Sequence, residues 1–151
     1  MSRLRGGGFQ AYLVGGAVRD LLLGGHPKDL DIATDATPEA VHSLFRNSRI
    51  IGRRFRIVHV RFGREIIEVT TFRGHHDSDQ EQPAEPGGNH SRQSASGLLL
   101  RDNVYGTLEE DAVRRDLTVN ALYYDSSTFE VFDHVHGLQD LERRSICIIG
   151  N

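Results

Sequence analysis

Apolar and polar side chains alternate along residues 56–62, where Val58 and Val60 fall on one side and their neighbours on the other. A period of two is typical of a strand with one buried face. The next stretch, 65–72, is rich in β-branched residues and predicts a second strand. Because Gly63 lies between the two stretches, we expect them to form a β-hairpin.

Shorter patterns predict the other elements. Apolar runs predict strands at 11–14, 30–34, 119–124, 129–132 and 146–149. Apolar spacing and the N-cap residues Thr37 and Thr107 predict helices at 18–22, 38–45, 107–115 and 137–143, and 4–8 resembles the end of a further helix. Because strands and helices mix without a βαβ repeat, the predicted fold class is α+β, a mixed β-sheet flanked by helices. The length of 151 residues suits one domain over 1–151.

The stretch 74–97 lacks Val, Ile, Leu and aromatic residues and is rich in Gly, Ser, Pro and charged residues. This composition predicts a flexible loop inside the domain. Its acids and histidines raise a metal cluster as an alternative, formed by His75, His76, Asp77, Asp79 and His90. No fixed ligand spacing supports that cluster.

Composition narrows the setting and the partners. No apolar run reaches the roughly 20 residues of a membrane span, and no secretory signal precedes residue 10. The single cysteine, Cys147, excludes an internal disulfide and favours a cytoplasmic setting. No feature predicts a membrane or protein partner. The net charge of −3 argues against a surface that binds nucleic acid everywhere.

Arginines are nevertheless dense in one segment, which has no acid before Glu65. They are Arg46, Arg49, Arg53, Arg54, Arg56, Arg61 and Arg64. A solvated basic face and a surface for phosphates both explain this run. For RNA binding we single out Arg53, Arg54 and Arg56.

The strongest local feature is the run Asp29-Leu30-Asp31. In a strand, residues i and i+2 face the same side, so two carboxylates project together while Leu30 points into the core. Paired acids raise each other's pKa unless a cation lies between them. Mg²⁺, which prefers oxygen ligands, is the obvious candidate. Solvated acids at a strand edge are the alternative.

Glycines precede these acids, at the junction of a strand and a short helix. Gly15 and Gly16 would let backbone N–H groups approach a phosphate, and Arg19 would add a charged donor. A tight turn and a surface arginine paired with Asp20 are the alternative interpretations.

Two further groups extend the candidate site. Glu68 lies in the middle of a predicted strand and offers a third acid, so that the acids could hold two divalent ions; an exposed edge glutamate is the alternative. Arg115 opens a dense polar run that continues through Asp116 to Asn120 and could bind ribose and triphosphate. Arginines at a helix end also simply complement its dipole.

Two long motifs carry a family resemblance. Residues 13–20 followed by 28–32 resemble the first signature of the class II tRNA nucleotidyltransferase and poly(A) polymerase family, and residues 110–122 resemble its second. The motifs come in the family's order, and the likeness covers nearly the whole chain. The resemblance implies the head-domain fold of polymerase β-like nucleotidyltransferases and nucleotide transfer to an RNA 3′ end.

Shorter stretches distinguish two branches of this family. Residues 52–60, 71–76 and 99–106 resemble the bacterial poly(A) polymerase branch, which transfers AMP from ATP. A CCA-adding tRNA nucleotidyltransferase shares the acids and the Arg-Arg-Asp run but usually lacks this combination. We therefore favour a poly(A) polymerase and keep CCA addition as the alternative.

The resemblance also implies a role for each matching residue. Asp29 and Asp31 would bind two Mg²⁺ ions, and Glu68 would orient or deprotonate the RNA 3′-hydroxyl. Asp116 would complete the catalytic set. The ATP would be contacted by Gly15, Gly16, Arg19, Arg115 and Asn120.

Family members continue into neck, body and tail regions, and the neck reads the base of the nucleotide. None of these regions is present in 1–151, so we expect a fragment that binds metal and triphosphate weakly and polymerises poorly. An inactive nucleotide- or RNA-binding fragment is a second alternative, although the complete set of acids weighs against it. A dinucleotide-binding fold is excluded because Gly15-Gly16 is not G-x-G-x-x-G.

Overall fold

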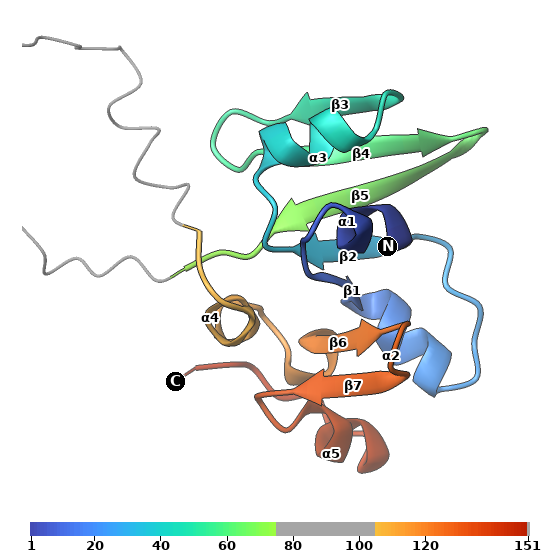
Figure 1. The fold of residues 1–151 in the computed structure, drawn as a ribbon. Helices are drawn as coiled ribbons and strands as arrows, with labels where there is room; N and C mark the ends of the chain where they lie inside the picture. The colour runs from blue at the N-terminus through green and yellow to red at the C-terminus, as the bar shows by residue number, and fades with distance from the viewer. Residues whose placement is uncertain (75–104, 151) are drawn as a thin grey trace, which may run out of the picture.

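The computed structural model describes residues 1–74 and 105–150 and contains one mixed β-sheet with helices beside it (Figure 1). Its seven strands lie in the order β3-β4-β5-β2-β1-β6-β7. Only β2 and β5 run parallel, and every other neighbouring pair is antiparallel. The strands are β1 (Ala11–Val14), β2 (Asp31–Thr34), β3 (Ser48–Ile51), β4 (Ile57–Phe62), β5 (Glu65–Thr71), β6 (Leu122–Asp125) and β7 (Glu130–Asp133). The predicted α+β class is confirmed.

Short helices connect the strands and cover the sheet. They are α1 (Ser2–Gly6), α2 (Gly16–Leu22), α3 (Pro38–Leu44), α4 (Leu108–Val113), the 3-10 helix η2 (Thr118–Asn120) and α5 (Gly137–Glu142). Thr37 caps α3 by accepting from the Ala40 N–H, and Thr107 caps α4 in the same way. These are the two caps that the sequence predicted.

One face of β2, β5 and β4 forms the main core. Ile32, Val69, Val58 and Val60 lie on this face, where α1 and α3 cover them. A second cluster fills the other face near β1 and β6, beneath α4. Its members are Val14, Ala33, Phe72, Leu108, Ala112 and Tyr123. The sheet therefore has one face covered by α1 and α3, and an opposite face on which α4 covers the β1–β6 end.

Cross-strand register places the polar residues of interest on this second face. Asp31 pairs with Val14 on one side and with Glu68 on the other. Glu68 then pairs with His59, and His59 pairs with Arg49. Paired residues share a face because side chains alternate along each strand. One row of side chains therefore crosses five strands from β1 to β3.

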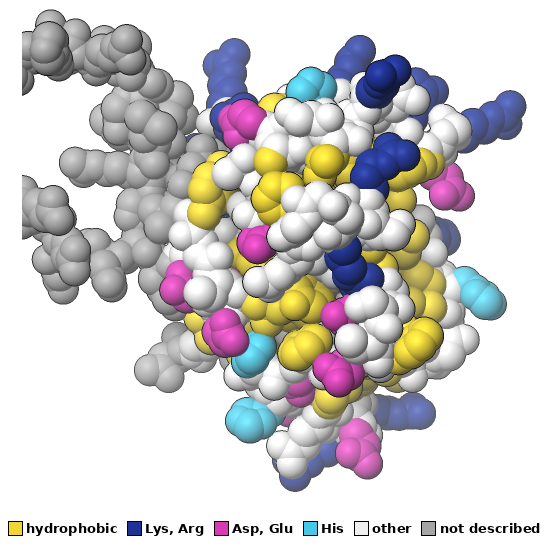
Figure 2. Space-filling view, in the orientation of Figure 1, with side chains coloured by type: hydrophobic (Ala, Val, Ile, Leu, Met, Phe, Trp, Pro, Cys, Tyr) yellow, Lys and Arg dark blue, Asp and Glu magenta, His cyan; other side chains and the backbone are white. Residues whose placement is uncertain are grey.

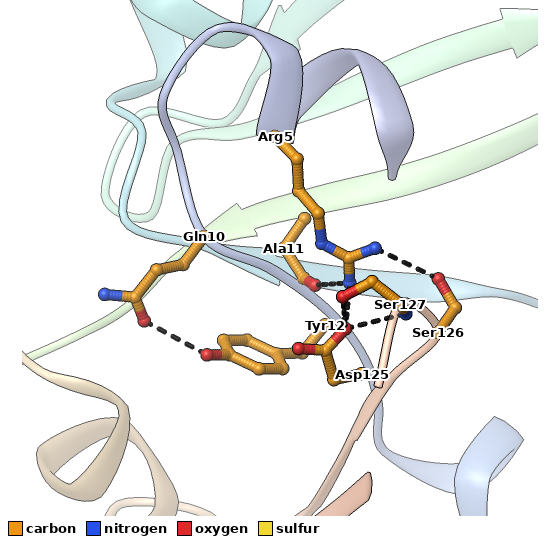
Figure 3. A network of polar contacts seen from close by, with 7 residues as sticks. All are labelled: Arg5, Gln10, Ala11, Tyr12, Asp125, Ser126 and Ser127. Carbon is orange, nitrogen blue, oxygen red and sulfur yellow. Dashed lines mark hydrogen bonds and ion pairs between the residues drawn. The ribbon is translucent and has the colours of Figure 1, made fainter. Parts of the chain in front are cut away.

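An arginine in α1 ties the start of the chain to the β6–β7 turn (Figure 3). Arg5 donates to the Ala11 carbonyl at 2.8 Å, to the Asp125 carboxylate at 2.6 Å and to the Ser126 hydroxyl at 3.3 Å. Asp125 also accepts from the backbone N–H and the hydroxyl of Ser127. This network joins α1, the start of β1 and the end of β6, and β1 leads into the candidate site.

The structure corrects several predicted elements. Strand β3 follows α3 and was not predicted, because Ser48–Ile51 is short and carries an arginine. The segment predicted as a strand from 119 begins with η2, so the strand starts at Leu122. Residues 146–149 form no strand, and Leu117–Ile148 is an isolated bridge. Ile146 and Ile148 are 79% and 77% exposed, so this apolar run is not a core strand.

Leu30 is also not a core residue, since it is 36% exposed and precedes β2. The predicted loop at 74–97, apart from Gly74, lies outside the described residues, as does the histidine and aspartate cluster between 75 and 90. Within 1–74 and 105–150, no helix reaches the length and apolar character that a membrane span requires.

Candidate active site

Two carboxyl groups meet where β2 and β5 run side by side. Asp31 is the first residue of β2 and pairs with Glu68 in the middle of β5. Both line a cleft of about 270 Å³. Burial raises the pKa of Asp31, which Arg115 opposes and Asp29 reinforces. Burial and the neighbouring Asp31 carboxyl raise the pKa of Glu68.

Asp29 lies just before β2, so the prediction that it shares a strand with Asp31 is wrong. The two acids still approach each other, because both line a second hollow of about 460 Å³ beside Gly16 and Arg19. Asp31 borders both hollows, which are therefore adjacent. Asp29 is exposed, while Asp31 is half-buried.

The chemistry of these donors suits Mg²⁺. The Asp31 and Glu68 carboxyls are held together with raised pKa values, an arrangement that a divalent cation stabilises. Mg²⁺ is usually held by one or two carboxylates together with substrate phosphates. Among the described residues, no three acid, histidine or cysteine side chains converge on one point. The acids therefore fit an ion that substrate phosphates help to hold.

Gly15 forms the tight turn between β1 and α2 directly beside these acids. Its φ of 77° and ψ of −148° belong to a region that is essentially restricted to glycine. A Cβ built here would lie 3.8 Å from Asp31 Oδ2 and 3.9 Å from Arg115 Nη1. The turn thus places backbone between an acid and an arginine, where a side chain would narrow the space.

Gly15→Ala is expected to destabilise the chain by about 1–3 kcal/mol and to weaken triphosphate binding, because the new side chain strains the turn and enters the space between Asp31 and Arg115. Thermal unfolding and a nucleotide titration measure the two effects. Gly63→Ala is the matched control, since Gly63 also has a positive φ (62°) but no atom within 4 Å of the added Cβ. Normal nucleotide affinity in Gly15→Ala would contradict the placement.

Arg19 and Asn120 meet although they are 101 positions apart in the chain. Arg19 Nη1 donates to Asn120 Oδ1 at 2.7 Å, and its Nε donates to Asp20 at 3.0 Å. The pairing with Asp20, which was the alternative interpretation of Arg19, therefore exists together with a direct bond between the two motifs. Arg19 is half-buried and lines the hollow that contains Asp29.

Arg115 is held by two residues that sequence reasoning gave no role. Its guanidinium donates to the Tyr123 hydroxyl at 3.0 Å and to Asp111 Oδ2 at 3.2 Å. The Tyr123 hydroxyl also donates to Asp111 Oδ2, at 2.5 Å. Burial lowers the pKa of Arg115, but Tyr123 and Asp111 outweigh this and raise it. The i, i+4 spacing of Asp111 and Arg115 was the one sequence signal for this network.

Three arginines line the same cleft as the acids. Arg73, Arg114 and Arg115 lie there together with Asp31, Glu68 and Asp111. Arg114 donates to the Gly74 carbonyl at 3.1 Å. The Arg73 guanidinium stacks over the Phe55 ring at 4.1 Å. A small cleft lined by both cations and carboxylates suits a ligand with several phosphates and bound metal.

Other predicted site residues lie apart from this cleft. Asp116 is exposed, and its carboxylate accepts from the Leu117 N–H at 2.7 Å; it does not line the cleft. Of the arginines singled out for RNA, Arg53 and Arg54 are exposed, and Arg56 is paired with Glu39. The roles assigned to these residues stay predictions.

Comparison with known proteins identifies the family. The sequence model described as the Poly A polymerase head domain matches residues 11–147. The chain belongs to this family. The Poly(A) polymerase I of Salmonella typhimurium is 56% identical over 99% of the chain and 31% of its own length. The CCA-adding enzyme of Bacillus pumilus is 43% identical over 95% of the chain and 32% of its own length.

A solved structure of the family has the same fold as this head domain. The crystal structure of the Bacillus stearothermophilus CCA-adding enzyme in complex with CTP matches with a TM-score of 0.76 and 34% identity, over 99% of this chain and 31% of that one. The chain spans about a third of the length of the relatives that it matches. The match therefore covers the head region that these poly(A) polymerases and CCA-adding enzymes share.

Proposed function

We propose that this chain is the catalytic head of a poly(A) polymerase, which transfers AMP from ATP to an RNA 3′-hydroxyl. The observation that carries the proposal is the cleft in which Asp31 and Glu68 face Arg73, Arg114 and Arg115. Identity of 56% to a Poly(A) polymerase I, against 43% to a CCA-adding enzyme, favours this branch. We assign the whole of 1–151 to the head, and the cytoplasmic setting stays a prediction.

The residues divide the work between two sides of Asp31. On the β1 side, the proposed role of Gly15, Arg19 and Arg115 is to bind the triphosphate. On the β5 side, the proposed role of Glu68 is to orient the RNA 3′-hydroxyl or accept its proton. Mg²⁺ held by Asp31, Glu68 and the substrate phosphates, with Asp29 beside them, would neutralise charge on the attacking and leaving oxygens.

The reaction is an in-line displacement in which the protein mainly positions the reactants and stabilises charge. The RNA 3′-oxygen bonds to the α-phosphorus of ATP, its proton passes to a base, and pyrophosphate leaves. The Arg115 guanidinium offsets negative charge on the phosphates. Its hydrogen bonds to the buried Asp111 and Tyr123 keep it in position. Asn120 accepts a hydrogen bond from Arg19 and so keeps it at the hollow that Asp29 and Asp31 line.

CCA addition is the second candidate, because the solved structure with the same fold is a CCA-adding enzyme bound to CTP. Among the described residues, no side chain can be named that would contact the base, so the structure does not favour ATP or CTP. The choice of nucleotide therefore has to be measured.

The test incubates the 151-residue chain with a short single-stranded RNA, Mg²⁺ and each of the four NTPs separately. Asp29→Ala/Asp31→Ala serves as the inactive control. Extension with ATP alone, absent in the control, supports the proposal. A parallel reaction uses a tRNA-like end that lacks its terminal CCA, and ordered addition of C, C and A there would replace poly(A) polymerase by CCA addition.

A chain that adds no nucleotide is tested for Mg²⁺-dependent ATP binding. Binding that the double variant loses would support the metal and nucleotide site and favour the inactive binding fragment over the enzyme. A chain that neither extends RNA nor binds ATP would overturn the proposed function.

A further inference from the structure

We propose that a basic groove on the outer strands β3, β4 and β5 binds the phosphate backbone of the RNA strand whose 3′ end enters the cleft. The inference deepens the proposed function and rests on it, because RNA as the acceptor comes from that proposal. None of the residues of the candidate active site lies in this groove.

The groove is a hollow of about 510 Å³ beside the carboxylate cleft. It is lined by Arg46, Asn47, Ser48, Arg49, Ile51, His59, Arg61 and Ile66. These eight residues supply three arginines and a histidine and include no carboxylate. Arg46, Arg49 and Arg61 are exposed, and none of them forms an ion pair with a carboxylate of the described residues. Their positive charges are therefore available to bind a polyanion.

Strand register connects this groove directly to the catalytic acids. Glu68 of the cleft pairs with His59, and His59 pairs with Arg49, all on the same face of the sheet. Neighbouring strands lie about 4.8 Å apart, so Arg49 lies about 10 Å from Glu68 along this row. A ligand that runs along the row passes from the groove to the acids without crossing to another face.

The geometry of the reaction determines the side from which the RNA 3′ end approaches. In an in-line displacement, the attacking oxygen and the leaving pyrophosphate lie on opposite sides of the phosphorus. Gly15 and Arg115 flank Asp31 on the β1 side, which we assign to the triphosphate. The 3′-hydroxyl must then approach from the β5 side, where Glu68, His59 and Arg49 follow one another.

The groove also has the mixed character that suits a single strand. Ile51 and Ile66 are 39% and 58% exposed and provide apolar surface between the arginines. Proteins that bind single strands without sequence preference combine a positive groove for the backbone with aromatic side chains on which bases stack, and here the two isoleucines offer the apolar surface for the bases. The chain's net charge of −3 makes this local concentration of arginine more selective, because it is not part of a generally basic surface.

The test measures binding of a fluorescent single-stranded RNA with a 3′-deoxy end, which prevents extension, by the 151-residue chain over a range of salt concentrations. Arg49→Ala and Arg61→Ala are each expected to weaken binding about threefold to tenfold and to reduce the salt slope by about 0.7. The double variant should lose more. Arg49→Lys keeps the point charge and should bind almost as tightly as wild type.

Arg143→Ala is the matched control, because Arg143 is an exposed arginine just after α5, at the other end of the sheet. It should bind RNA as wild type does. ATP affinity and the unfolding temperature of every groove variant should also match wild type. Unchanged RNA binding in the double variant, or an equal loss of ATP binding, would overturn the groove.

A second measurement tests the direction of the strand. A 4-thiouridine placed two nucleotides from the 3′ end should crosslink to the segment 46–61, whereas crosslinks to α2 or α5 would overturn the proposed path. The two proposals fail separately. A chain that binds RNA through the groove but neither adds a nucleotide nor binds ATP refutes the proposed function alone. A chain that extends RNA while its groove variants bind normally refutes the groove alone.

Discussion

Replacing Asp31 by asparagine is expected to reduce nucleotide transfer by about 10²–10³-fold, the usual scale for removing one group that stabilises the charge of a transition state. The change keeps the shape of the side chain but removes the charge that faces Glu68 and Arg115. Initial rates of RNA extension at saturating ATP measure the loss. Because the repulsion with Glu68 also disappears, the unfolding temperature should stay the same or rise slightly.

Two matched controls accompany this variant. Asp35→Asn changes an exposed aspartate just after the same strand, whose carboxylate accepts from the Gln10 N–H, and should keep full activity. Glu65→Gln and Glu68→Gln change two acids of β5 that lie on opposite faces, and only Glu68→Gln should lose activity. If Asp31→Asn extended RNA at the wild-type rate, the carboxylate cleft would not be the active site.

The second large effect is expected from Asp111, which is 6% exposed and holds Arg115. Asp111→Asn should lower stability by about 2–3 kcal/mol, because Arg115 loses its charged partner and the Tyr123 hydroxyl loses a carboxylate acceptor. The unfolding temperature should fall by about 5–10 °C. ATP binding should weaken as well, since Arg115 is then no longer fixed at the cleft.

Glu109→Gln is the control on the same helix, because Glu109 is exposed and has no contact with Arg115; it should resemble wild type. Tyr123→Phe removes only the hydroxyl between Asp111 and Arg115. Its losses of stability and of ATP affinity should lie between those of Glu109→Gln and Asp111→Asn. Wild-type stability and wild-type ATP affinity in Asp111→Asn would together refute the positioning role of this network.

Local patterns predicted the elements whose side chains alternate clearly. The alternation in 56–62 and the glycine at 63 predicted β4, β5 and their turn, and the threonine caps predicted α3 and α4. Strand β3 was missed because a four-residue strand at an edge leaves almost no pattern. The run 146–149 misled because an apolar sequence does not reveal whether anything covers it.

The candidate site, too, was predicted from the sequence only in part. Asp31 and Glu68 were named from the sequence, but their contact follows from the parallel pairing of β2 with β5, which connects distant segments. The spacing rule failed for Asp29 because β2 begins two residues later. Tyr123 resembled an ordinary core aromatic, and its role is visible only once Asp111 and Arg115 are seen to meet at its hydroxyl.

The bond between Arg19 and Asn120 has a consequence for how the chain folds while it is being made. The two residues are 101 positions apart, and ribosomes add about 5–20 residues per second, so Arg19 waits roughly 5–20 s for its partner. During that interval β1 can pair with β2, but its other edge, which β6 later covers, stays open. An open edge in the middle of a future sheet is a template for unwanted pairing with other nascent chains. Synthesis of β6, which begins two residues after Asn120, therefore removes this exposed edge.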